Sequence, residues 1–355
     1  MNDIARERAS LYRDMAPRHL TPLWEVLHRL VPPRPEPACL PHQWKYADVR
    51  PFVERSGEVI TAEEAVRRVL IFENPGLPGQ SRVTGSLYAG LQLILPGEIA
   101  PAHRHTQSAL RFIVEGSGAY TAVDGERTTM HPGDFILTPS WTWHDHGNEG
   151  REPVVWLDGL DIPTIAFLDA GFAENASAAV QAIARPEGTS AARHGANLAP
   201  VRDADARPYG MASPLFSYPY DRSRAALAAL VQAKAPVDAC DGYKLRYVNP
   251  ATGGWPMPTM AAFLQWLPAG FRGQGSRQTD AAVYSVVEGH GRAVVEPAGA
   301  GAGASRTFDL GPRDHFVVPS WAKLSLAADE DCVLFSFSDR PIQQAIGVWR
   351  ESRAG

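Results

Sequence analysis

The sequence predicts an all-β protein in which one strand-rich domain occurs twice, accompanied by a helical N-terminal arm and a helical linker. Short runs of apolar and β-branched residues, broken by Gly and Pro, fill residues 83–175 and return from about 257 to 340. This spacing of strands and turns is typical of a sandwich or barrel. Similar motifs recur in both regions in the same order, which indicates an internal duplication.

Two pairs of motifs carry the duplication. VVEGHG at 286–291 matches IVEGSG at 113–118, at an offset of 173 residues. GPRDHFVVPSW at 311–321 matches HPGDFILTPSW at 131–141, at an offset of 180 residues. Two matches in the same order and at similar offsets are most simply explained by the repetition of one β domain.

The first thirty residues are predicted to be helical. Thr21 followed by Pro22 suits an N-cap with proline at the first helical position. VPPRPEP at 31–37 is expected to end the helix and begin an extended stretch. TAEEAVRRVL at 61–70 predicts a short helix, because its first and fourth residues have the spacing of a capping box.

A linker separates the two β regions. It is rich in Ala, Arg and Pro, and DRSRAALAALVQAK at 221–234 predicts a helix within it. The expected segments are a helical and extended arm (1–82), a first β domain (83–175), a linker with a helix (176–245), and a second β domain with the C-terminal tail (246–355).

Length, charge and hydropathy exclude several kinds of partner. The 355 residues suffice for two medium-sized domains. The net charge is −5 without a long basic block, which argues against nucleic-acid binding. No apolar stretch approaches the roughly 20 residues that span a bilayer, and the charged N-terminus lacks the apolar core of a signal peptide. We therefore expect a cytoplasmic protein with no membrane partner, in which Cys39, Cys240 and Cys332 are reduced thiols.

A pair of histidines precedes the second apolar run of the first β region. PAHRHTQSALRF at 101–112 places His103 and His105 two positions apart, so in a strand they point to the same face. The pair alone does not distinguish a metal site from a surface pair. His144 ends a later predicted strand, and from a neighbouring antiparallel strand it would complete a face of three imidazoles.

Other histidines in this region leave alternatives open. His146 follows His144 by two residues, so strand geometry turns it either toward the same cavity or into a supporting structural role. His131 also lies in this region, and the spacing assigns it no role.

These motifs resemble those of the cupin family. The family's first motif contains a Gly, His-x-His, an acidic ligand and a Gly, and its counterparts here are Gly97, His103, His105 and Gly116. The second motif has its counterparts in Gly133, Pro139, His144 and Asn148. The resemblance implies a double-stranded β-helix of the jelly-roll type, duplicated along the chain.

One metal ligand of the family pattern has no counterpart. The usual glutamate falls near Ala109 or Leu110, so three histidines remain without the carboxylate of the common facial triad. In the second domain the offsets place Ser276, Gln278 and Leu324 at the ligand positions. We therefore expect the second domain to be metal-free. His290 and His315 fall at other positions of the repeat, and we interpret both as structural.

A closer resemblance is to the gentisate 1,2-dioxygenase family. It extends from RRVLIFENPGL (67–77) through the histidine motifs to PVVWLDGLDIP (153–163) and the degenerate second cupin. The resemblance implies one Fe(II) per chain, a homotetramer, and ring cleavage of gentisate by O2 to maleylpyruvate. Dioxygenases of salicylate or 1-hydroxy-2-naphthoate in the same wider family remain alternatives, as does a non-enzymatic bicupin that binds a small molecule.

The substrate implied by this resemblance is a small aromatic acid, which needs positive partners. Arg111 follows His105 by six residues, an even step that allows it to share the inward face, and an unpaired buried guanidinium would be costly. We expect it to bind the substrate carboxylate, with Arg67 as a second candidate or else a helix-surface charge. His146 is the candidate for proton transfer.

Several other residues are candidates to line the pocket or to orient ligands. For the aromatic ones, core packing is the alternative. They are Gln107, Tyr88, Gln92, Trp143 and Asp158.

Three neutral imidazoles suit this chemistry. They leave the 2+ charge of a metal uncompensated and up to three positions of an octahedral ion open. A 2-hydroxybenzoate can fill two of these with its carboxylate and its phenol oxygen, and O2 can take the third.

Overall fold

The computed structural model describes residues 3–196, 200–201, 210–299 and 303–353. The chain divides into two units, Met1–Glu36 and Pro37–Gly355, each of which is described by itself. The first unit contains the helix α1 (Asp3–Met15), the 3₁₀ turn η1 (Ala16–Arg18) and the helix α2 (Leu23–Leu30). The predicted Thr21 cap is wrong, because Pro22 is the N-cap residue of α2 and no side chain caps the helix.

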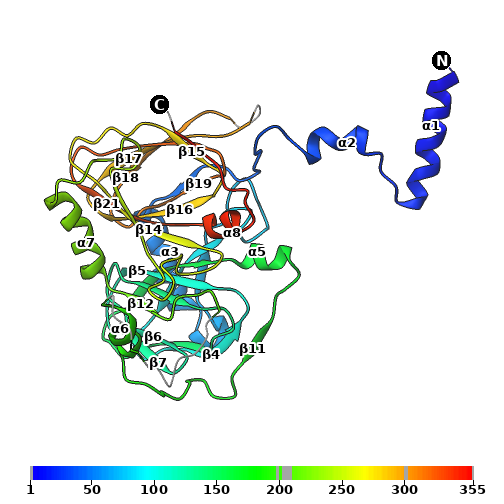
Figure 1. Ribbon diagram of the computed structural model, residues 1–355. Coiled ribbons are helices and arrows are strands. Elements are labelled where there is room, and N and C mark those ends of the chain that lie inside the picture. Colours follow the sequence, from blue (N-terminus) through cyan, green and yellow to red (C-terminus); the bar gives the residue numbers. More distant parts are fainter. Residues whose placement is uncertain (1–2, 197–199, 202–209, 300–302, 354–355) are drawn as a thin grey trace. The chain divides into compact units, whose positions relative to one another are not determined.

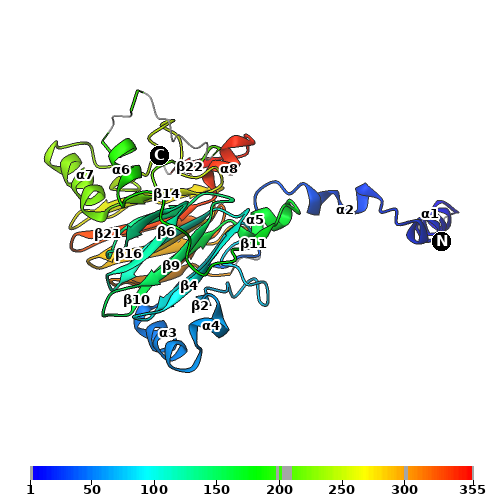
Figure 2. The same ribbon diagram turned by 90° about the horizontal axis from the view of Figure 1, so that it is seen from below.

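The second unit contains two barrels, each built from a six-stranded and a five-stranded antiparallel sheet. The strands of the first barrel are β2 (Val69–Ile71), β3 (Tyr88–Ile94), β4 (Ile99–His105), β5 (Ala109–Glu115), β6 (Ala119–Val123), β7 (Glu126–Thr129), β8 (Phe135–Thr138), β9 (His144–Asn148), β10 (Val154–Leu160), β11 (Ala173–Asn175) and β12 (Ser217–Tyr218). Figure 2 shows β4, β9 and β6 side by side in the five-stranded sheet of this barrel.

The second barrel repeats this architecture (Figure 1). Its strands are β1 (His42–Trp44), β13 (Tyr243–Arg246), β14 (Ala261–Leu267), β15 (Ser276–Gln278), β16 (Ala282–Glu288), β17 (Gly291–Glu296), β18 (Arg306–Leu310), β19 (His315–Val318), β20 (Lys323–Ala327), β21 (Cys332–Ser338) and β22 (Glu351–Arg353). The six-stranded sheets have the orders β12-β8-β5-β10-β3-β2 and β1-β19-β16-β21-β14-β13, which correspond strand by strand. The duplication predicted from the motifs is therefore present in the topology.

The edge strands are exchanged between the two barrels. β1 lies in the segment predicted as the arm but pairs with β19 of the second barrel, where Trp44 stands opposite His315. β12 lies in the predicted linker but pairs with β8 of the first barrel. These crossings link each barrel to a distant part of the chain. The bounds of the four segments given above stay a prediction.

Helices connect and flank the barrels. They are α3 (Tyr46–Val59), α4 (Ala62–Ala65), α5 (Ile162–Phe167), α6 (Thr189–His194), α7 (Tyr220–Gln232) and α8 (Arg340–Ala345). The helix predicted in the linker is confirmed as α7. The helix predicted over 61–70 is a single turn, since α4 ends at Ala65 and Val66 has a φ of 55°. Its capping box of Thr61 and Glu64 is present. No helix in the described part of the chain is long and apolar enough to cross a membrane.

The six-stranded sheets of the two barrels share one hydrophobic core. Phe112 of β5 stacks on Phe335 of β21 with ring centroids 4.1 Å apart and planes 7° from parallel. Each fully buried aromatic or branched side chain contributes about 1.5–3 kcal/mol of hydrophobic stabilisation. A separate cluster fills the first barrel, and it includes Ile94, Ile113 and Trp156. The outer faces of β5 and β10 pack in the shared core, which holds both strands in place. Their inner faces carry Arg111 and Asp158.

Candidate metal centre

Three histidines meet on the facing strands β4 and β9. His103 stands opposite His144 in the register of the two strands, next to an irregularity between Ala100 and His103. His105 lies two residues further along β4 on the same face. One ligand nitrogen of each histidine lies within 4.8 Å of the others. The structure therefore brings together the three histidines that the sequence predicted to form one face.

Hydrogen bonds to main-chain carbonyls orient these rings. Nδ1 of His105 donates to the Gln107 carbonyl at 2.8 Å, and Nδ1 of His144 donates to the Thr142 carbonyl at 2.9 Å. Nδ1 of His103 lies 3.2 Å from the Pro101 carbonyl. A carbonyl only accepts, so in His105 and His144 the proton sits on Nδ1 and the lone pair of Nε2 is free for a metal ion. The donor set fits a divalent transition metal that favours imidazole.

The site keeps its histidines neutral. Burial, followed by the charge of Arg67, lowers the pKa of His103 to about 3. Burial also lowers the pKa of His105 to about 4 and that of His144 well below its ordinary value. At neutral pH, protons therefore do not compete with a metal for these imidazoles.

Arg111 is buried in the barrel beside Asp158. It stands opposite Asp158 across β5 and β10, and its Nε lies 3.8 Å from Asp158 Oδ1. One terminal nitrogen donates to Thr138 Oγ1 at 2.7 Å, while Nε has no hydrogen-bond partner among the described residues. Burial raises the pKa of Asp158 to about 6, and the charge of Arg111 opposes that shift. The pair thus presents a guanidinium whose donors are only partly satisfied.

Arg67 lies next to His103. Since α4 ends before it, Arg67 is not on a helix surface, and its guanidinium donates to the Pro101 carbonyl at 2.6 Å and contacts His103 Nδ1. Burial, and then the charge of Arg111, lowers the pKa of Arg67 to about 10. A second cation therefore stands beside the three histidines.

His146 is turned into the same barrel. It is fully buried, its ring centroid lies 6.0 Å from that of His144, and its Nδ1 is 2.9 Å from Thr121 Oγ1. Nε2 has no partner among the described residues. Thr121 stands directly opposite His146 in the pairing of β6 with β9, and it was not anticipated from the sequence because only this long-range register reveals it.

Of the other residues predicted to line the pocket, some lie at the metal centre and one lies outside it. Gln92 is buried on β3 opposite Trp156, and Tyr88 begins the same strand, where burial and then Asp158 raise its pKa. Gln107 serves the site through its main-chain carbonyl. The structure does not bring Trp143 to the histidines.

Trp143 belongs to the outer face of the sheet. The guanidinium of Arg104 lies between the rings of Trp141 and Trp143, 4.6 Å from each centroid. Arg104 lies between the two inward histidines of β4, so its side chain faces outward and Trp143 faces outward with it.

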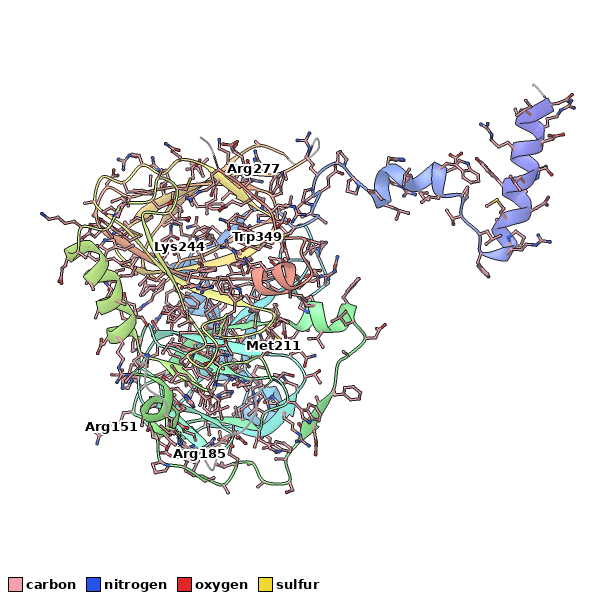
Figure 3. The ribbon with its side chains drawn as sticks, in the orientation of Figure 1. Arg151, Arg185, Met211, Lys244, Arg277 and Trp349 are labelled. Atoms are coloured by element: carbon pink, nitrogen blue, oxygen red, sulfur yellow. The ribbon has the colours of Figure 1, made fainter. Side chains whose placement is uncertain are left out.

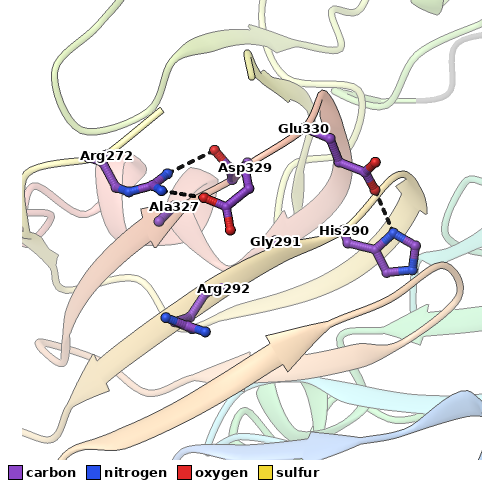
Figure 4. A pocket seen from close by; sticks show the side chains of 8 residues that line it. Arg272, His290, Gly291, Arg292, Ala327, Asp329 and Glu330 are labelled. Carbon is purple, nitrogen blue, oxygen red and sulfur yellow. Dashed lines mark hydrogen bonds and ion pairs between the residues drawn. The ribbon is translucent and has the colours of Figure 1, made fainter. Parts of the chain in front are cut away.

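The histidines outside this cluster have other environments. His131 is exposed and lies 3.4 Å from Asp134. His315 is buried, with its ring 5.1 Å from that of Phe72 in the described core. His290 lines a surface hollow of about 400 Å³. Figure 4 shows His290 paired with Glu330 there, and Arg272 paired with Asp329.

The register confirms which residues replace the histidines in the second barrel. Ser276 of β15 stands opposite Leu324 of β20, as His103 stands opposite His144. We therefore predict one metal ion per chain, since serine and leucine cannot replace two imidazoles. Metal analysis of the purified protein should approach one equivalent, and a reproducible two equivalents would contradict the prediction.

Two jelly-roll barrels, one of them with a three-histidine centre suited to a metal ion, define a bicupin. A family model described as a cupin domain matches residues 90–160. Over 350 residues the chain is 51% identical to gentisate 1,2 dioxygenase 1 of Aquipseudomonas alcaligenes, covering 99% of this chain and 97% of the relative. It is 39% identical to a gentisate 1,2-dioxygenase of a Streptomyces species, covering 97% and 94%.

A solved structure agrees with these relatives. Salicylate 1,2-dioxygenase from Pseudoaminobacter salicylatoxidans, in its adducts with gentisate, superposes with a TM-score of 0.89 at 35% identity, covering 98% of this chain and 94% of the other. The chain belongs to the gentisate 1,2-dioxygenase family.

Proposed function

We propose that the protein is an Fe(II)-dependent dioxygenase that cleaves gentisate with O2 to maleylpyruvate. The observation that carries the proposal is the three-histidine centre next to two arginines, Arg67 and Arg111. A catalytic metal and an anionic substrate would meet there. The high identity to a gentisate 1,2-dioxygenase supports the choice of substrate. A homotetramer in the cytoplasm remains part of this proposal, and light scattering on the purified protein would test the assembly.

His103, His105 and His144 would hold the iron through Nε2. When bound, the iron supplies Lewis acidity toward the substrate oxygens and a path for electrons from the ring to O2. The hydrogen bonds from Nδ1 to carbonyls keep the rings in place for this ligation.

Arg111 and Arg67 would bind the substrate carboxylate. A charge-assisted hydrogen bond to a carboxylate is stronger than a neutral one, and burial excludes competing water. Asp158 balances part of the charge of Arg111 and keeps the guanidinium ionised and in place.

His146 would accept or deliver a proton at the ring hydroxyl through Nε2. This nitrogen is buried and has no protein partner in the described part of the chain, so it is available to a substrate oxygen. Thr121 holds the other nitrogen and thereby the orientation of the ring.

The role of Thr121 can be tested by removing its hydroxyl. Thr121→Val keeps the size of the side chain but removes a hydrogen bond worth about 1 kcal/mol, so we expect kcat to fall about five- to tenfold. KM and iron content should stay near the wild-type values, and Thr121→Ser should restore most of kcat. Equal losses in the Val and Ser variants would show that the hydroxyl has no such role.

Oxygen uptake across related substrates tests the function. Gentisate should be turned over fastest, since its second hydroxyl makes the ring easier to oxidise. Salicylate lacks that hydroxyl, so its kcat should be lower than that of gentisate while its KM changes less. Hydroquinone lacks the carboxylate, so its KM should be higher than that of gentisate. Faster turnover of salicylate or 1-hydroxy-2-naphthoate would replace gentisate as the substrate. No uptake with any of them would favour a non-enzymatic binding protein.

A further inference from the structure

The second barrel has a cavity beside β13 and β14, the two strands that correspond to β2 and β3 of the first barrel. Three pairs of opposing residues establish the correspondence. Gln265 of β14 stands opposite Lys244 of β13, as Gln92 stands opposite Val69 in the first barrel. The other two pairs are Ser336 opposite Tyr284, where the first barrel has Asp158 opposite Arg111, and Leu324 opposite Ser276, where it has His144 opposite His103.

Fixed cations stand in this cavity instead of metal ligands. The cavity measures about 510 Å³, and Lys244, Arg246 and Arg340 are among its lining residues. The side chains of Lys244 and Arg340 are each only 15% exposed. Arg340 donates to Gln278, which lies two residues after Ser276 and so takes the position of His105 in the repeat. A permanent positive charge therefore lies next to a vacated ligand position.

Aromatic rings lie between these cations. The ring of Phe263 lies 5.1 Å from Lys244 Nζ and 5.1 Å from the guanidinium carbon of Arg340. The ring of Trp255 lies 5.0 Å from the guanidinium carbon of Arg246. Cations and ring faces together favour a flat anion, whose carboxylate meets a cation while its body packs against a ring.

One cation of the cavity lacks an acid. Lys244 pairs with Asp241 at 3.1 Å, and Arg340 pairs with Asp280 at 3.2 Å. The lining acid Asp238 pairs with Arg353.

Arg246 is the exposed cation of the cavity, and no carboxylate lies within ion-pair distance of it among the described residues. Its guanidinium donates to the Gly253 carbonyl at 3.1 Å. The cavity therefore has one positive charge more than its acids neutralise.

We propose that this cavity binds a small aromatic carboxylate without cleaving it. The cations supply the charge that the metal would supply in the first barrel, and the site lacks the imidazoles needed to hold a redox metal. The inference does not depend on ring cleavage by the first barrel, although it leads us to use the same compounds as probes.

The test is anaerobic calorimetry of the full-length, iron-loaded protein with gentisate and, separately, with salicylate. We expect two sites per chain for at least one of them. Arg246→Gln should weaken only the second site, by about tenfold or more, because a charge-assisted hydrogen bond is lost. Arg246→Lys should retain most of the affinity.

Two further variants control this test. Arg151→Gln, an equal change of net charge at an exposed arginine of the first barrel (Figure 3), should leave both sites unchanged. His144→Ala should affect only the first site, which separates a failure of the proposed function from a failure of this proposal. One site per chain with both probes, or a second site that Arg246→Gln leaves unchanged, would overturn the proposal.

Discussion

His144→Ala is expected to abolish ring cleavage and to lower bound iron to a small fraction of one equivalent. His144 is fully buried between the other two histidines, with ring centroids 4.3 Å from His103 and 4.8 Å from His105. Two imidazoles without a carboxylate are too few ligands to retain Fe(II) against water. We expect a loss of activity of at least about 10³-fold, which corresponds to about 4 kcal/mol of transition-state stabilisation.

Iron content and activity must be measured together on this variant. His131→Ala is a matched control, because this exposed histidine lies outside the cluster and its loss should leave both values unchanged. Full iron content in His144→Ala would remove His144 from the ligand set. Iron loss with retained activity would instead argue that iron is not the catalytic group.

The alternation of strand residues explains why the metal centre could be predicted from the sequence. His103 and His105 are separated by one residue, so any strand through them places both rings on one face. The same rule sends Trp143, the neighbour of His144, to the opposite face, where it meets Arg104. Its assignment to the substrate pocket rested on residue type, and the periodicity of the strand argues against it.

Features that depend on long-range pairing could not be predicted. Thr121 touches His146 only because β6 and β9 are neighbours in that register. The exchange of β1 and β12 between barrels has no local signal, since both are only two or three residues long. The helix α3 was missed because Pro51 interrupts its pattern, although the structure carries the helix through it.

The inward orientation of Arg111 was predicted correctly from its even spacing of six residues after His105. The step from His105 crosses the turn between β4 and β5, so its parity alone does not guarantee the face. The structure supplies the reason that Arg111 faces inward, since it stands opposite Asp158 and a buried guanidinium needs a nearby carboxylate.

Arg111→Gln is expected to produce the second large effect, on both substrate binding and stability. If Arg111 binds the substrate carboxylate, its loss removes charge-assisted hydrogen bonds worth about 1.5–3 kcal/mol, so KM for gentisate should rise about 10- to 100-fold. The variant also leaves Asp158 buried without its cation. Breaking one side of a buried ion pair costs about 3–5 kcal/mol of unfolding free energy.

The pH dependence of stability identifies the cause of that cost. Burial already raises the pKa of Asp158 to about 6 in the presence of Arg111, and removing Arg111 should raise it further. A carboxyl whose pKa is higher in the folded than in the unfolded protein binds more protons when folded, so stability falls as pH rises between the two values. The deficit of Arg111→Gln should therefore be smaller at pH 5 than at pH 8.

The double variant Arg111→Gln with Asp158→Asn separates the two effects. Replacing the carboxylate removes the buried charge, so stability should largely return and residue 158 should no longer make it fall between pH 5 and pH 8. KM should stay high, because no cation meets the substrate from this position. Denaturant unfolding at pH 5 and pH 8 gives the stability, and steady-state oxygen uptake gives KM. If the double variant regained wild-type KM, Arg111 would support Asp158 but would not bind the substrate.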